Sequence, residues 1–194
     1  MIKIEVKDRK VPFRNNNKFI LIGQSAAGKD WAIKKLQEEF GYPKLVSHTT
    51  RPPRPHEKNG YDYFFVESFD PEVNQWVEYR QYETVENGKP STWYYWLVPE
   101  QVSQPNYIGI LDYEGALQLI DWSYLNLGDR PTLVYVWASP STLRQRASKR
   151  PGYEEAEFNR RLETDLAWEK DAMEIADIII YNDKEKNYET NTND

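Results

Sequence analysis

The sequence predicts an α/β fold in which a parallel β-sheet is flanked by helices. Short apolar runs, such as Phe19-Ile20-Leu21-Ile22 and Leu133-Val134-Tyr135-Val136-Trp137, alternate along the chain with helix-length stretches. Strands that are apolar on both faces are typical of parallel sheets covered by helices on both sides. A different pattern interrupts this alternation at about residues 48–105, where aromatic and β-branched runs surround an Asn-Gly pair. This segment predicts a small, mostly antiparallel sheet inserted into the core.

The first part of the core is expected over residues 18–47. Residues 1–17 before it are charged and polar, and we interpret them as an N-terminal extension or an edge strand. The apolar residues 18–22 predict the first core strand. A helix is expected over residues 30–40, since Gly41 follows it as a left-handed cap. Residues 44–48 predict a short strand.

The inserted segment opens with a proline-rich loop at residues 51–60. Strands are expected over residues 61–66, 75–83 and 91–98, because aromatic and β-branched residues dominate there. Asn87-Gly88, between the last two strands, is a strong hairpin signal. We therefore expect the insert to end in a β-hairpin.

The second part of the core is expected over residues 106–183. Its predicted strands are residues 107–112, 132–138 and 177–181, which are apolar at their centres. Its predicted helices are residues 114–124, 141–150 and 154–175, and Pro151-Gly152 forms a turn before the last of them. Residues 184–194 are polar and are expected to fray. One domain at residues 18–183 follows from this reading.

Composition excludes several classes of function. The chain has 194 residues, no cysteine and two histidines, His48 and His56, so disulfides, thiol catalysis and histidine-built metal centres are not expected. A formal net charge of −6 argues against general nucleic-acid binding, which depends on many cations. The sequence contains neither a signal peptide nor an apolar stretch long enough to cross a bilayer. A cytoplasmic protein without membrane association is therefore expected.

Residues Gly23 to Asp30 read Gly-Gln-Ser-Ala-Ala-Gly-Lys-Asp and directly follow the first apolar strand. Backbone N–H groups of such a loop hold phosphate oxygens, and the helix that it opens directs its positive end toward them. Lys29 is expected to reach the outer phosphates. Asp30 departs from the G-x-x-x-x-G-K-[ST] pattern, and an ordinary strand–turn–helix with a surface lysine is the alternative. The predicted phosphate-binding residues are Gly23, Gln24, Ser25, Ala26, Ala27, Gly28, Lys29 and Asp30.

A second segment resembles the nucleoside-monophosphate site of guanylate kinases. Ser47-His48-Thr49-Thr50-Arg51-Pro52-Pro53-Arg54 and the following Gly60-Tyr61-Asp62-Tyr63 match that family's Ser-x-Thr-Thr-Arg-x-Pro-Arg and Gly-x-Asp-Tyr. The resemblance extends over about residues 19–183. It implies a P-loop NTPase-type parallel sheet flanked by helices, a mostly antiparallel monophosphate-binding subdomain, and a helical lid at about residues 144–162.

The resemblance implies roles for individual residues of the acceptor site. Arg51, Arg54 and Tyr63 are expected to bind the monophosphate, and guanidinium groups suit this role because they engage phosphate oxygens in pairs. Glu78 matches the family's glutamate that accepts from the N1–H and amine of guanine. The same pocket is expected to include three further residues, Ser47, Tyr95 and Asp112.

Around the hairpin the chain departs from the family. Trp96 and Leu97 replace the small and hydroxyl residues that follow the retained tyrosine, Tyr95, and the hairpin is longer at about residues 84–90. These differences leave base selectivity and sugar preference open, whereas the phosphate-binding residues are kept.

The resemblance also implies a donor site for ATP. Arg146, Arg150 and Arg161 match the lid arginines that stabilise the transferring phosphoryl group, and Asn182 lies near the donor's adenine. A basic patch on two exposed helices is the alternative for the arginines. With Lys29, they form the predicted catalytic set.

Asp30 is the expected contact to Mg²⁺, through water. The family has another aspartate two residues before the one matched by Asp112, and this chain has Ile110 there. Asp30 compensates for that loss in one interpretation, because Mg²⁺ favours carboxylate oxygens. In the other, it stabilises the N-terminus of its helix.

The predicted function is ATP-dependent phosphorylation of GMP or dGMP to the diphosphate, with Mg²⁺. One alternative is a kinase for another ribo- or deoxynucleoside monophosphate. The other is a non-catalytic guanylate kinase-like module that binds phosphorylated partners.

Overall fold

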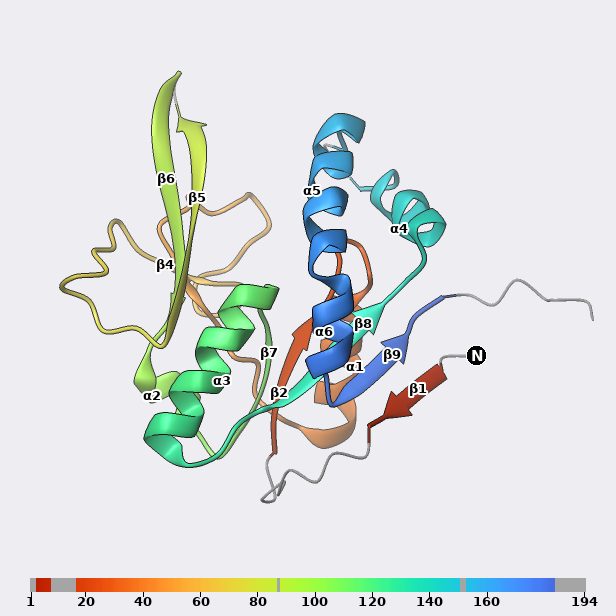
Figure 1. Ribbon diagram of the computed structural model, residues 1–194. Helices are drawn as coiled ribbons and strands as arrows, with labels where there is room; N and C mark the ends of the chain where they lie inside the picture. The colour runs from red at the N-terminus through yellow and green to blue at the C-terminus, as the bar shows by residue number, and fades with distance from the viewer. Residues whose placement is uncertain (1–2, 8–16, 87, 151–152, 184–194) are drawn as a thin grey trace, which may run out of the picture.

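The computed structural model describes residues 3–7, 17–86, 88–150 and 153–183 (Figure 1). Three expectations lie outside these residues: the fraying tail at 184–194, the turn at Pro151-Gly152, and the part played by Asn87 in the hairpin turn. The rest of the predicted domain is described.

The larger of two sheets forms the core, with its strands in the order β1-β9-β8-β2-β7. Strands β9, β8, β2 and β7 are parallel to one another, which confirms the predicted parallel core. The edge strand β1, in the predicted N-terminal extension, pairs antiparallel with β9, so Lys3 lies opposite Tyr181. The strands are β1 (Lys3–Val6), β2 (Asn17–Ile22), β7 (Asn106–Ile110), β8 (Thr132–Trp137) and β9 (Ile178–Tyr181).

Helices cover both faces of this sheet because alternate residues of its central strands point to opposite sides. Ile20 and Tyr135 face one hydrophobic cluster, to which α3 and α6 contribute Leu119 and Ala172. Leu21 and Val136 belong to the other cluster, where α1, α4 and α5 contribute Ile33, Leu143 and Leu162. The helices are α1 (Lys29–Phe40), α3 (Tyr113–Leu127), α4 (Pro140–Ala147), α5 (Glu155–Ala167) and α6 (Glu169–Ile175).

The single helix predicted over residues 154–175 is two helices, because α5 ends before Trp168 and α6 begins after it. The indole ring of Trp168 stacks on Tyr113 with the centroids 5.4 Å apart and meets the edge of Tyr135. Packing of this large ring into the first hydrophobic cluster therefore ends α5 where the sequence contains neither proline nor glycine.

The smaller sheet has the order β4-β3-β6-β5, with strands β3 (His48–Thr49), β4 (Phe64–Phe65), β5 (Glu78–Glu86) and β6 (Lys89–Leu97). Only β3 and β4 are parallel among the pairs of this sheet that the structure describes. The expected strands at 44–48 and 61–66 are mostly loop. Only His48 of the first lies in β3, and only Phe64 and Phe65 of the second lie in β4. Of the extra hairpin residues, Thr84, Val85 and Glu86 continue β5, and Lys89 and Pro90 begin β6, where Val85 pairs with Pro90. A short helix, α2 (Pro99–Val102), leads back to the core.

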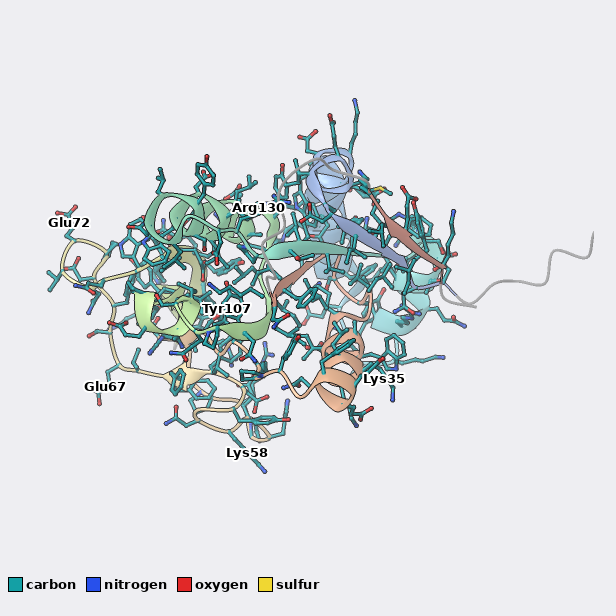
Figure 2. The ribbon with its side chains drawn as sticks, turned by 90° about the horizontal axis from the view of Figure 1, so that it is seen from below. Lys35, Lys58, Glu67, Glu72, Tyr107 and Arg130 are labelled. Carbon is teal, nitrogen blue, oxygen red and sulfur yellow. The ribbon has the colours of Figure 1, made fainter. Side chains whose placement is uncertain are left out.

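The two sheets lie side by side, and the β5–β6 hairpin and α5 extend in the same direction from the core (Figure 1). Figure 2 shows Glu67 and Glu72 on the loops of the smaller sheet, on the far side of the molecule from Lys35 on α1. No helix among the described residues combines the length and apolar character needed to cross a bilayer.

Candidate active site

The loop from Gly23 to Asp30 joins β2 to α1, and two of its positions require glycine. Gly23 has a φ of +146°, and a Cβ atom there would lie 2.3 Å from the carbonyl oxygen of Val136. Gly28 has a φ of +100°, and its Cβ would lie 2.4 Å from Nδ2 of Asn182. The loop is therefore pressed against the ends of β8 and β9 more closely than any side chain at these positions permits.

The side chain of Lys29, which was predicted to bind the outer phosphates, folds back against the loop. Its Nζ donates to the carbonyl oxygens of Gly23, at 2.6 Å, and Gln24, at 3.0 Å. Burial lowers the pKa of Lys29, and the carboxylates of Asp165 and Asp30 partly oppose that shift. An ammonium held beneath the loop in this way carries positive charge to the place where donor phosphates are expected.

Arg146 and Asn182 hold the loop from the side of α4 and β9. The carbonyl oxygen of Ala27 accepts from Asn182 Nδ2 at 2.7 Å and from Arg146 Nη1 at 3.0 Å. Arg146 Nη2 also donates to the main-chain oxygen of Asn182, at 2.7 Å. These two predicted donor-site residues thus support the backbone of the phosphate loop in this conformation.

The other two predicted lid arginines are exposed and lie near the loop. Arg150, just beyond α4, is close enough to Lys29 for its charge to lower the pKa of the lysine. Arg161, on α5, opposes the rise in the pKa of Asp165. Figure 1 shows α4 and α5 beside each other at one end of the core sheet. Lys29, Arg146, Arg150 and Arg161 are therefore in one region.

Two acidic residues that the sequence analysis did not single out contact the loop. Asp165 Oδ2 accepts from the backbone N–H of Ser25 at 2.8 Å, and Glu169 accepts from the side-chain amide of Gln24. Burial raises the pKa of Asp165, whereas the Ser25 N–H and Lys29 oppose the rise. Their only signal in the sequence is a four-residue spacing, which many other pairs of acids share.

The predicted monophosphate residues form a cluster on the smaller sheet. Arg51 is 4% exposed, its Nε donates to the hydroxyl of Tyr95 at 3.0 Å, and its guanidinium lies 5.4 Å from the ring centre of Tyr63. Burial raises the pKa of Tyr63, which keeps its hydroxyl protonated. The structure thus brings together Arg51, Tyr63 and Tyr95, although they come from three separate segments.

Glu57 is a further member of this cluster, and the sequence analysis assigned it no role. Its Oε1 accepts from Arg51 Nη2 at 2.8 Å, and its Oε2 accepts from the backbone N–H of Arg54 at 2.8 Å. The Arg54 side chain is mostly exposed and lies 3.8 Å from the same carboxylate. Glu57 therefore positions both arginines and balances their charge.

Glu78 begins β5 and its carboxylate is buried at the start of α3. The residue is only 2% exposed, and no hydrogen bond engages its carboxylate among the described residues. A Cβ on Gly115 would lie 2.9 Å from Glu78 Oε2, so glycine permits the close approach of α3. Burial, reinforced by Asp112, raises the pKa of Glu78 to about 8, while Arg80 opposes the rise.

Asp112 lies beside Glu78 and its carboxylate is already bonded. Oδ1 accepts from the N–H of Gly115 at 2.7 Å and caps α3, while Oδ2 accepts from Arg80 Nε at 2.9 Å and the Tyr82 hydroxyl at 3.0 Å. Arg80 and Tyr82 were missed in the sequence. Their spacing was the available signal, since every second residue of a strand faces the same side and Glu78 begins this series.

The residues that depart from the family, Trp96 and Leu97, are buried on opposite faces of β6, because successive residues of a strand point to opposite sides. Trp96 is 5% exposed and stacks on Phe69, with ring centres 4.2 Å apart, whereas Leu97 is fully buried. Tyr95, between Tyr94 and Trp96, points to the Arg51 side instead. Ser47 is half-buried, and its carbonyl oxygen accepts from the N–H of Phe64. Trp96 therefore packs within the smaller sheet, whereas Leu97 belongs to the hydrophobic cluster that also contains Ile20 and Tyr135 of the core sheet.

An electrostatic interaction links the residues predicted to bind the base with those around the phosphate loop. The charge of Asp112, beside Glu78, contributes to the raised pKa of Asp165, the α5 residue that contacts the loop. The carboxylates of Asp112 and Asp165 are therefore close enough to interact electrostatically.

This arrangement agrees with a family assignment. The family model described as Guanylate kinase matches residues 15–190. The chain belongs to the guanylate kinase family. The predicted resemblance to a divergent member is thus confirmed, and so is the α/β fold class.

Curated guanylate kinases are similar to this chain over most of its length. The guanylate kinase of Chlamydia felis (strain Fe/C-56) is 31% identical over 186 residues, which cover 88% of this chain and 83% of the relative. That of Legionella pneumophila (strain Paris) is 31% identical over 192 residues, or 87% of each. A solved guanylate kinase structure from Anaplasma phagocytophilum has a TM-score of 0.54 and 22% identity, covering 87% of this chain and 79% of the other. The structural likeness supports the fold.

Proposed function

We propose that this guanylate kinase family member transfers a phosphoryl group from ATP to GMP or dGMP and releases the two diphosphates. The observation that supports guanine most directly is the buried Glu78 carboxylate without a hydrogen-bond partner among the described residues. Guanine has two adjacent donors, N1–H and the exocyclic amine, which one carboxylate accepts together. Adenine has a lone pair at N1 and lacks this match.

On the donor side, the loop amides and Lys29 would hold the outer phosphates of ATP. Phosphoryl transfer needs two nucleotides in line and neutralisation of charge on the moving group. Arg150 and Arg161 are exposed beside the loop and would approach that charge when ATP is bound. Arg146 would act through the loop backbone, because its donors contact the carbonyl oxygens of Ala27 and Asn182.

On the acceptor side, Arg51, Arg54 and Tyr63 would bind the monophosphate, with Tyr95 positioning Arg51. Glu78 would bind the base, and Ser47 lies in the matching segment for the guanine carbonyl. Asp112 would serve mainly to orient Arg80, Tyr82 and the start of α3, since its carboxylate already accepts from each of them.

The proposed donor site offers Mg²⁺ one carboxylate, that of Asp30. Among the described residues, no group of three or more acidic, histidine or cysteine side chains could hold a metal ion by itself. Mg²⁺ in kinases is usually held by one or two carboxylates together with substrate phosphates, so a large cluster is not needed. Asp30, in the first turn of α1 beside Lys29, is the carboxylate that we propose for its water shell. Bound Mg²⁺ would neutralise charge on the phosphates.

The decisive experiment measures ADP release from ATP with each of the eight common ribo- and deoxynucleoside monophosphates. Turnover with GMP or dGMP above all others supports the proposal, and selective turnover of another monophosphate assigns a different acceptor. Lys29→Ala should reduce turnover by at least about 100-fold, because charge stabilisation in the transition state is lost. Its melting temperature should stay close to that of the unmutated protein.

Absence of turnover with every acceptor, in a folded protein, would favour the non-catalytic module. That module predicts binding of a phosphorylated peptide at Arg51 and Arg54 instead. A cytoplasmic location and the absence of general nucleic-acid binding stay predictions.

A further inference from the structure

The backbone N–H of Ser25 is one of the loop donors that should face a donor phosphate. It donates instead to Asp165 Oδ2, at 2.8 Å, although Asp165 lies on α5, far from the loop in sequence. The side chain of Asp165 is half-buried against the loop. A carboxylate bound to this N–H occupies the position of a phosphate oxygen, because both are anionic acceptors of backbone donors.

The charges around Asp165 match those that a donor phosphate would meet. Its carboxylate interacts with the positive charges of Lys29 and Arg161, each of which opposes the rise in its pKa that burial causes. The same two residues belong to the set that should contact the transferring group. The carboxylate therefore has both the backbone donor and the cations of a phosphate site.

A second contact fixes the segment that carries Asp165. Glu169, one helical turn further along at the start of α6, accepts from the side-chain amide of Gln24 and lies 3.4 Å from the Tyr135 hydroxyl. Gln24 is fully buried. The α5–α6 junction thus holds the loop at two successive residues, Gln24 and Ser25.

We propose that Asp165 is an internal occupant of the donor site, whose carboxylate must leave the Ser25 N–H before a donor phosphate binds there. The inference rests on the proposed function of the loop as the ATP site. No covalent step is involved, since one anion replaces another on the same donor. Asp165 is then a residue that sets donor affinity, and it weakens binding of any phosphate that arrives without a compensating cation.

The experiment compares binding of ATP and of inorganic pyrophosphate, each in EDTA without metal, to the unmutated protein, Asp165→Asn and Asp165→Ala. Calorimetry should show both variants binding the two probes about 5- to 100-fold more tightly, the range typical of such couplings. Pyrophosphate isolates the loop from adenine contacts. Thermal unfolding of each variant verifies that it is folded, and the second substitution covers the case in which the first fails to fold.

Glu163→Gln is the matched control, because Glu163 lies on the same helix, is exposed, and loses the same charge. It should change the affinity for ATP less than about twofold, as expected of a screened surface charge. An equal gain in metal-free ATP affinity for Glu163→Gln and Asp165→Asn would show that only the net charge matters, and would overturn the proposal. GMP affinity should be equal in all variants.

Three other outcomes distinguish failure of this proposal from failure of the proposed function. Unchanged or weaker metal-free binding in both Asp165 variants, with ATP turnover intact in the unmutated protein, overturns the internal occupant and leaves the proposed function standing. A loss of Mg·ATP affinity without any gain for metal-free ATP places Asp165 on the metal instead, and also overturns it. If no variant binds ATP with or without Mg²⁺, the donor site itself is wrong and both proposals fail.

Discussion

Burial of the Glu78 carboxyl group would couple the proposed guanine site to pH. Its pKa is raised to about 8, mainly by burial and then by the charge of Asp112. At neutral pH the group is therefore largely protonated in the free protein. A protonated carboxyl donates one hydrogen bond and cannot accept two donors from guanine in the way a carboxylate does.

We expect the affinity for GMP to rise with pH between about 6 and 8 and then level off, because binding requires loss of the Glu78 proton. Calorimetry in two buffers of different ionisation enthalpy should detect release of close to one proton per GMP near pH 7. Glu78→Gln should weaken GMP binding and remove the pH dependence. An unmutated protein whose GMP affinity is flat across this range would contradict the role of Glu78.

The same group affects folding with a definite sign. Because the folded pKa lies above the ordinary value of 4.5, Glu78 binds its proton more tightly in the folded state. Its stabilising contribution is complete below that ordinary value and is lost as pH rises through about 8. The free energy of unfolding of Glu78→Gln should therefore fall less over this window than that of the unmutated protein.

Arg80 should tune this titration, because its charge opposes the rise in the pKa of Glu78. We expect Arg80→Ala to shift the midpoint of the pH dependence of GMP binding to higher pH, and Arg80→Lys to shift it less. Calorimetric titrations from pH 6 to pH 9.5 measure both midpoints. A shift of equal size in the two variants would show that geometry, and not charge, is responsible.

At the scale of elements, the phosphate loop depends on how the ends of β8, β9 and α4 surround it. The carbonyl oxygen of Ala27 is held by Asn182 and Arg146, and Gly28 lies directly against Asn182. Helix α1 begins at the loop without a side-chain cap, which leaves its first N–H groups directed to a ligand. Loop conformation and helix position are therefore set together.

Gly28→Ala should disrupt this arrangement, because its Cβ would lie 2.4 Å from Asn182 Nδ2 at a φ of +100°. We expect destabilisation of at least about 1–3 kcal/mol together with a large rise in the KM for ATP. Gly128→Ala is the matched control, since Gly128 also has a positive φ but nothing within 4 Å of its Cβ. Thermal unfolding and kinetics should show loss of stability in both variants and a raised KM for ATP in Gly28→Ala alone.

At the scale of the whole molecule, the two substrates are assigned to different sheets. The donor loop follows β2 of the parallel core, whereas Arg51 and Arg54 lie in the loop that follows β3 of the smaller sheet. Mutations of these arginines should therefore raise the KM for the acceptor and leave the KM for the donor unchanged. The two arginines offer a clean comparison, because one is buried and the other is exposed.

Arg51→Ala and Arg54→Ala should each raise the KM for GMP at least about tenfold, as expected for the loss of a charge-assisted contact, with the KM for ATP nearly unchanged. Arg51→Ala should also destabilise the protein by about 3–5 kcal/mol, because Glu57 would keep a buried charge without its partner. Arg54→Ala should melt like the unmutated protein. Steady-state kinetics and thermal unfolding separate these effects, and equal increases for ATP and GMP would show that the sites are assigned wrongly.

Local patterns in the sequence were enough to predict the strands of the core and the two phosphate-binding segments. Apolar runs such as residues 18–22 predicted the parallel core because buried strands need side chains that are apolar on both faces. The glycine-bounded loop with Lys29, and the Arg51–Arg54 segment, predicted two phosphate sites because their residues are close together in the chain. The sequence also predicted helix ends that are marked by glycine, such as the end of α1 at Gly41.

The contacts between side chains from distant segments could not be predicted from the sequence, because they depend on how the helices and strands pack. Asp165 reaches the Ser25 N–H, Arg80 and Tyr82 engage Asp112, and Glu57 neutralises Arg51. The break between α5 and α6 likewise results from stacking of Trp168 on Tyr113, not from any helix-breaking residue. Each of these contacts depends on the direction of a side chain once the helices and strands have packed. Local patterns therefore specify the elements and the loop, and packing specifies the partners that tune the site.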